Sequence, residues 1–124
     1  MKKIIYTEKA PTPVGAYSQA VEKNGMLFVS GQIPINPKTG EIPPTIEEQT
    51  KLVMENVKAI LEEAGYSLED VVKSTILLTD MGNFKVVNKI YGEYYKENPP
   101  ARAAFAVREL PLGVLVEIET IAIK

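Results

Sequence analysis

Apolar residues recur at helical spacing in two segments of the chain. The first segment follows a pair of prolines, starts with a Thr45-x-x-Glu48 capping box and ends at Gly65. The second has Asn83 as its expected N-cap, and a Pro-Pro pair after residue 98 as its stop. The apolar positions are Ile46, Val53, Val57, Ile60 and Ala64 in the first segment, and Phe84, Val87, Tyr91 and Tyr94 in the second. This spacing predicts two amphipathic helices.

Elsewhere, short runs of branched residues bounded by Gly, Pro or Asn predict β-strands. The stronger runs are residues 26–35, 71–79, 102–107 and 114–123, and the weaker ones are Lys3–Tyr6 and Tyr17–Lys23. The resulting order is β-β-β-α-β-α-β-β. It predicts an α+β fold in which the helices cover one side of a sheet.

The last of these runs carries apolar residues on both faces. Alternation separates Val114, Val116, Ile118, Thr120 and Ala122 on one face from Leu115, Glu117, Glu119, Ile121 and Ile123 on the other. Two helices cover only one face of a sheet, so we expect the second face to pack against another subunit. Glu117 and Glu119 would then lie at or near that interface. The alternative is that this strand lies at a solvated edge of the sheet.

Length and charge narrow the possible functions. A chain of 124 residues with 45% hydrophobic and 24% charged residues is typical of one globular domain, 1–124. The net charge of -2 does not favour a polyanion as partner, so nucleic acid is not expected. The N-terminus lacks the apolar core of a signal peptide, and no segment has the length of a membrane span, which together predict a cytoplasmic protein.

The sequence contains neither cysteine nor histidine. Disulfides, thiol nucleophiles, Cys/His zinc sites and an imidazole base are therefore excluded. Any chemistry must come from carboxylates, Arg, Lys, Tyr, Ser, Thr, amides or the backbone.

Arg102 stands out in the stretch PPARAAFAV. Strand alternation puts it on one face with Ala104, Ala106 and Arg108, so small side chains leave room beside it. A guanidinium with space around it fits a carboxylate through two parallel hydrogen bonds. The alternative from the pattern alone is a structural ion pair with Glu117 or Glu119.

Four other residues are candidates for a site. Ser30 and Gly31 end an apolar strand, where a glycine allows close approach of a ligand or simply marks a bulge. Asn88 falls within the apolar stripe of the second predicted helix, so its amide needs a partner. Tyr17 fits either a core position with its hydroxyl bonded or the rim of a pocket.

These residues occur within motifs that resemble the Rid family, the reactive intermediate deaminases, and most closely its RidA branch. The motifs are SGQIP, NPKTGE, PAR and VEIE, and the similarity extends over essentially the whole chain. The resemblance implies a chorismate-mutase-like fold of about six strands and two helices, assembled as a homotrimer with active sites between subunits. It also implies hydrolysis of 2-iminobutanoate and 2-iminopropanoate to 2-keto acids and ammonia, without a metal or organic cofactor.

The resemblance assigns roles to the candidate residues. Arg102 matches the family's carboxylate-binding arginine, and Glu117, the first acid of VEIE, matches the residue that holds the attacking water. Tyr17, Ser30, Gly31 and Asn88 look like pocket wall and polar contacts. Ala104 departs from the pattern, since many RidA proteins carry cysteine there, and this puts the preferred substrate size in doubt more than the reaction.

Three other functions compete with the deaminase. A chorismate mutase needs more cationic residues around its dicarboxylate substrate than Arg102 alone. A non-catalytic trimer that senses small keto acids would need Arg102 but not Glu117. A ribonuclease or translation inhibitor is disfavoured by the acidic net charge and the absence of histidine.

Overall fold

The computed structural model describes residues 1–124, and both predicted helices form. Helix α1 spans Ile46–Glu63. The hydroxyl of its N-cap, Thr45, accepts a hydrogen bond from the Glu48 amide at 3.2 Å and donates one to Glu48 Oε1 at 2.9 Å. Gly65 follows the last turn with a φ of +81°, which glycine adopts without strain. The predicted start and stop of this helix are confirmed.

Helix α2 spans Phe84–Tyr94 and is shorter than predicted. Asn83 occupies the N-cap position, but its side chain makes no capping hydrogen bond. A 3₁₀ turn, η2 (Met81–Asn83), precedes the helix instead, and the Asp80 carboxylate caps it by accepting a backbone amide at 2.7 Å. The helix ends early because Tyr95 leaves helical geometry, with φ of −129° and ψ of 65°, and buries its ring.

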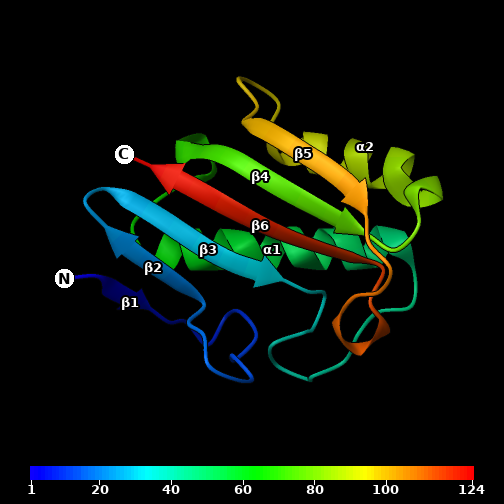
Figure 1. Ribbon diagram of the computed structural model, residues 1–124, viewed down its shortest axis with the longest axis horizontal. Coiled ribbons are helices and arrows are strands. Elements are labelled where there is room, and N and C mark those ends of the chain that lie inside the picture. The colour runs from blue at the N-terminus through cyan, green and yellow to red at the C-terminus, as the bar shows by residue number, and fades with distance from the viewer.

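Six strands form one mixed sheet in the order β1-β2-β3-β6-β4-β5 (Figure 1). Their bounds are β1 Lys3–Ile5, β2 Ala20–Lys23, β3 Met26–Gln32, β4 Val71–Leu78, β5 Ala101–Ala106 and β6 Val116–Ile123. Only β4 and β5 pair in parallel, and α2 makes the crossover between them. Because β6 lies between β3 and β4, the alternative of a solvated edge strand is wrong.

Three strand ends differ by two or more residues from the sequence-based prediction, and the others agree to within one residue. Tyr17 lies in the loop before β2 rather than in the strand. β3 ends at Gln32 because its pairing with β6 shifts register between Val29 and Gln32. β6 begins at Val116, after a second 3₁₀ turn, η3 (Pro111–Gly113). A third such turn, η1 (Leu68–Asp70), leads into β4.

Helices α1 and α2 cover one face of the sheet (Figure 1). The hydrophobic core lies between this helical layer and the sheet. Alternate residues of β6 point into this core, as predicted: Val116, Ile118, Thr120 and Ala122 are buried. Thr120 pairs in register with Ser74 of β4, and their hydroxyls are 3.3 Å apart, so these two buried polar side chains satisfy each other. Neither helix has the length and apolar character needed to cross a membrane.

The opposite face of the sheet, called the open face below, is covered by no element of the chain. It carries Phe28, Phe105 and Ile123, which are 44%, 47% and 43% exposed. These side chains lie on three strands of one face and accompany the half-buried Leu77 and Ile121. Exposed apolar residues grouped in this way mark a surface suited to contact with another protein.

Ile118 tests the assignment of the core face. Its side chain is fully buried at the centre of the sheet. We expect Ile118→Ala to lower the free energy of unfolding by about 2–5 kcal/mol and Ile118→Val by about 0.5–1.5 kcal/mol. Urea denaturation at fixed protein concentration measures both values. Equal and small effects of the two substitutions would contradict the burial of this side chain.

Candidate active site

Glu117 and Gly31 lie against each other on neighbouring strands. Gly31 sits in the register shift of β3, and a Cβ placed on it would overlap the Glu117 carboxylate. The backbone of Gly31 does not have a positive φ, so the glycine is needed for space rather than for conformational freedom. The sequence left two alternatives for Gly31, a bulge or a close approach. The structure shows a bulge at Gly31 and also a close approach, although the approaching group is the Glu117 side chain and not a ligand.

Ser30, next to this glycine, is tied to the loop that carries Tyr17. The Ser30 hydroxyl donates to the Ser18 carbonyl at 2.6 Å, and the Ser30 amide donates to the Gln19 carbonyl at 2.9 Å. The proton of the Ser30 hydroxyl is therefore engaged, which leaves its oxygen to act as an acceptor.

Tyr17 is a rim residue rather than a core residue, since its side chain is 52% exposed. Its hydroxyl oxygen is 3.4 Å from the Val14 amide, at the long limit of a hydrogen bond. The hydroxyl proton remains available to a ligand. Tyr17, Ser30, Gly31 and Glu117 thus gather around the β3–β6 pair and are called the β3 group.

Arg102, Asn88 and Ala104 form a second group at the edge of the sheet, called the β5 group. Arg102 Nη1 donates to Asn88 Oδ1 at 2.7 Å, so the arginine is the partner of the Asn88 amide oxygen. Asn88 itself is exposed, unlike the stripe residues beside it. Ala104 follows Arg102 on the same face, as the alternation predicted, and its small side chain is partly buried against the core.

The two groups lie on opposite faces of one chain. Arg102 pairs in register with the buried Ser74, which places it on the helix face, whereas Glu117 pairs with Leu77 on the open face. β5 is also three positions from β3 in the strand order, roughly 14 Å at the usual strand spacing. An ion pair between Arg102 and Glu117 or Glu119 within one chain is therefore wrong, because both acids lie on the other face.

The environment of Glu117 raises its pKa. Burial is the larger cause, because it disfavours the charged form, and the neighbouring Glu119 carboxylate adds repulsion. Arg102 does not contribute, in agreement with its position on the other face. At neutral pH Glu117 is a stronger base than an exposed glutamate.

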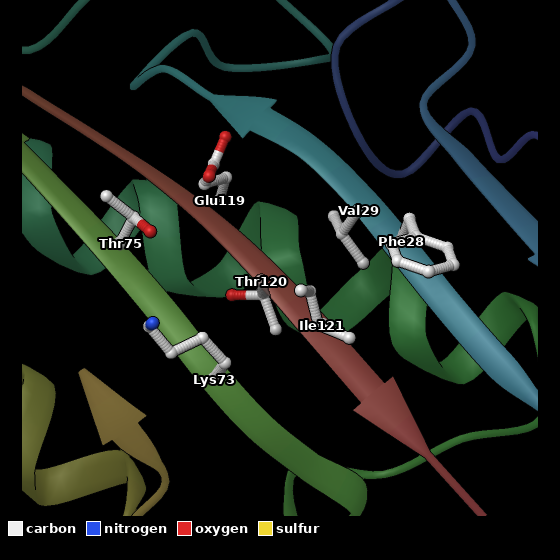
Figure 2. Close-up of a pocket in the computed structure, with 7 residues that line it drawn as sticks. All are labelled: Phe28, Val29, Lys73, Thr75, Glu119, Thr120 and Ile121. Atoms are coloured by element: carbon white, nitrogen blue, oxygen red, sulfur yellow. The ribbon is translucent and has the colours of Figure 1, made fainter. Parts of the chain in front are cut away.

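A hollow on the open face lies beside the β3 group (Figure 2). It is lined by Phe28 of β3, by Lys73 and Thr75 of β4, and by Glu119 and Ile121 of β6. None of the predicted site residues belongs to it. No group of three or more acidic side chains is arranged to hold a metal ion.

Comparison with known proteins places this geometry in a family. The model of the Endoribonuclease L-PSP family, to which Rid and RutC proteins belong, matches residues 7–124. The chain is 56% identical to a RutC family protein of Pyrococcus horikoshii, over the whole chain and 99% of that protein. A solved Rid family protein of Yersinia pestis superposes with a TM-score of 0.98 at 47% identity, with both chains fully covered. The chain belongs to the Rid family.

One relative of this Rid protein has a suggested activity. Escherichia coli TdcF is 44% identical over the whole chain and 98% of its own length, and its name provisionally describes it as a reactive intermediate deaminase. Its crystal structure with bound serine superposes with a TM-score of 0.94 at 42% identity over 98% of each chain.

Sequence reasoning missed three residues that hold the two groups in place. The first is Gln19, whose side chain is 1% exposed. Its Nε2 donates to the carbonyls of Thr7, Ala10 and Pro11, and its Oε1 accepts from the Thr7 amide. These hydrogen bonds fix the loop that carries Tyr17. No local pattern signals this role. Phe84 and Tyr91 of α2 surround Arg102. Their helical spacing around Asn88 was the available signal.

The pKa of Glu117 gives a pH-dependent prediction. Since its folded-state pKa lies above the usual 4.5, the native state holds an extra proton, and the free energy of unfolding falls as pH rises above that value. Glu117→Gln removes this effect, so the stability of the variant relative to wild type should increase as pH rises from 4 to 7. Denaturation at several pH values measures the difference.

Glu119→Gln provides the control for this prediction. It should lower the Glu117 pKa without returning it to the ordinary value, because burial remains. Carboxyl NMR titration of Glu117 reports this directly, and an ordinary pKa in the wild-type protein would contradict the assignment.

Proposed function

We propose that this protein is a cofactor-independent 2-imino acid deaminase that acts on 2-iminobutanoate and 2-iminopropanoate. These reactive intermediates arise when pyridoxal-phosphate enzymes dehydrate threonine or serine, and hydrolysis yields a 2-keto acid and ammonia. The whole chain, 1–124, acts as one RidA-like domain. The predicted cytoplasmic location stays a prediction.

The observation that carries the proposal is a carboxylate of raised pKa in the same chain as an arginine with free donors. Arg102 uses only one N–H of its fork for Asn88, which leaves donors for a substrate carboxylate. Glu117 supplies a base, which a protein that only binds keto acids does not need.

The separation of the two groups supports an assembly of several copies. A small imino acid cannot reach Arg102 and Glu117 of one chain, because they lie on opposite faces of the sheet and on strands separated by β4. If the β5 group of one copy meets the β3 group of the next, the contact is head-to-tail, and it forms a ring when its rotation closes after a few copies. The apolar residues of the open face would be covered in the same assembly. The resemblance to RidA proteins favours a homotrimer.

In the proposed mechanism Arg102 holds the substrate carboxylate and Glu117 activates water. The water oxygen attacks C2 of the iminium, and its proton passes to Glu117. Glu117 then returns the proton to the amine nitrogen. As the C–N bond breaks, the C2–OH oxygen becomes the keto carbonyl and its proton passes to the departing ammonia, so the nitrogen leaves as ammonium and Glu117 is again ionised. Since an iminium carbon is already electrophilic, positioning and proton transfer supply most of the rate.

Arg102 and Glu117 should have separable effects in a coupled assay. A threonine dehydratase supplies the imine, semicarbazide competes for it, and wild type should suppress semicarbazone formation. Arg102→Ala should lower kcat/KM by roughly a hundredfold or more, because two charge-assisted hydrogen bonds are lost. Glu117→Gln should still bind 2-ketobutyrate and lower kcat by about a hundredfold or more, because the base is lost.

Other outcomes of this assay decide between functions. If wild type binds 2-ketobutyrate but never lowers semicarbazone, the protein is a binding module rather than an enzyme. The family's endoribonuclease description motivates a parallel test with single-stranded RNA. RNA cleavage that persists in both variants would overturn the proposal.

Mixing the two inactive variants tests whether each site spans two copies. In a ring reassembled from equal amounts of Arg102→Ala and Glu117→Gln chains, about a quarter of the sites combine an intact arginine with an intact glutamate. We expect activity to return to that level after joint unfolding and refolding. The control is the Arg102→Ala chain refolded alone. No recovery in the mixture would show that the site lies within one chain.

A further inference from the structure

The guanidinium of Arg102 lies against one face of helix α2. Phe84, Asn88 and Tyr91 follow one another at spacings of four and three residues, so they share a face of the helix. Arg102 Cζ is 5.3 Å from the ring centroid of Phe84 and 5.3 Å from that of Tyr91. Arg102 Nη1 donates a hydrogen bond to Asn88 Oδ1 at 2.7 Å. All three contacts to the guanidinium therefore come from a single element, helix α2.

We propose that Phe84, Asn88 and Tyr91 form a clamp that sets the orientation of Arg102 and presents its free N–H edge to the substrate carboxylate. Phe84, Asn88 and Tyr91 are then positioning residues for the carboxylate-binding group. Asn88 acts through Arg102 instead of contacting the substrate. The inference rests on the proposed function, since it concerns the same site.

The location of Arg102 makes a clamp necessary. β5 is an edge strand, the arginine is exposed, and its neighbours Ala104 and Ala106 are too small to restrict it. A long side chain in such a position is free to sample many rotamers and must lose that freedom when it binds. Contacts made before binding reduce that loss, and the planar guanidinium is well suited to lie over aromatic rings.

The chemistry of the clamp preserves the charge of the arginine. An amide oxygen accepts one N–H without carrying charge, and the two rings attract a cation through their faces. A carboxylate in place of Asn88 would accept the same hydrogen bond but would compete with the substrate for the positive charge. The clamp therefore orients Arg102 and leaves it able to bind an anion.

Tyr91 contributes its ring rather than its hydroxyl. The side chain is 3% exposed and packs against Tyr95 with ring centroids 4.8 Å apart and planes at 46°. The hydroxyls of Tyr91 and Tyr95 both lie near Ser74 without making a hydrogen bond of good geometry. The ring of Tyr91 is thus held rigidly behind Arg102, and the half-buried Phe84 is the more tolerant position for substitution.

The test compares Phe84→Leu and Asn88→Asp with wild type. In the deaminase assay each variant should raise KM about threefold to thirtyfold, since each removes or opposes one interaction of the arginine. kcat should change by less than about twofold, because the carboxylate contact is made equally before and during reaction. Phe84→Tyr restores a ring and should restore KM. Glu93→Gln, on α2 in the hollow toward α1, is the matched control.

Two readouts separate the clamp from the proposed function. NMR of the Arg102 Nε–Hε group should show a resonance displaced by ring currents, which moves in Phe84→Leu and returns in Phe84→Tyr. Calorimetry with 2-ketobutyrate should show the same loss of affinity as KM. If wild type has no deaminase activity but both readouts behave in this way, the function is wrong and the clamp stands.

The opposite pattern overturns the clamp. If wild type deaminates imines while the two variants keep its KM, its 2-ketobutyrate affinity and its Arg102 resonance, then α2 does not position the arginine. An unchanged Arg102 resonance in Phe84→Leu contradicts the clamp even if wild type binds no keto acid.

Discussion

The parallel pairing of β4 with β5 is the constraint on which the candidate site depends. Its register sets Arg102 opposite Ser74, and Ser74 in turn lies opposite Thr120 in β6. All three side chains must therefore share the helix face. A slip of one residue would move the guanidinium to the open face, beside Thr75 and Glu119, because side chains alternate along a strand. The crossover through α2 fixes this register, and the same helix supplies the partners of Arg102.

Local sequence patterns predicted the helices and strands of this fold well, but they did not predict which strands pair with each other. The alternation in β6 identified the buried and open faces, and the Thr45 cap and Gly65 placed both ends of α1. The position of β6 between β3 and β4 could not be read from its sequence, because strand order is set by contacts between distant segments. For the same reason the C-terminal end of α2 was misplaced, since the helix ends where Tyr95 buries its ring, several residues before the stop signal of the two prolines.

The site shows the same division between local and distant information. The small neighbours of Arg102 and the polar Asn88 were visible as local anomalies, but the hydrogen bond that joins them spans 14 residues. Gly31 illustrates why a motif alone was ambiguous. Its lack of a side chain makes room for Glu117, a residue on another strand, and no pattern around the glycine contains that fact. The resemblance to RidA proteins supplied the roles that the residues by themselves left open.

Keeping Arg102 and Glu117 on opposite faces has a chemical consequence. A guanidinium next to Glu117 within the chain would stabilise the carboxylate and lower its pKa, and the same contact would occupy the donors that a substrate carboxylate needs. Separation preserves both properties: Glu117 keeps the raised pKa that burial and Glu119 give it, and Arg102 keeps its free edge. In the proposed assembly the substrate would enter between these two groups, with its carboxylate toward the cation and its reacting carbon toward the base. In that assembly Arg102 and Glu117 act on one substrate only where two copies meet, because within a single copy they are too far apart to do so.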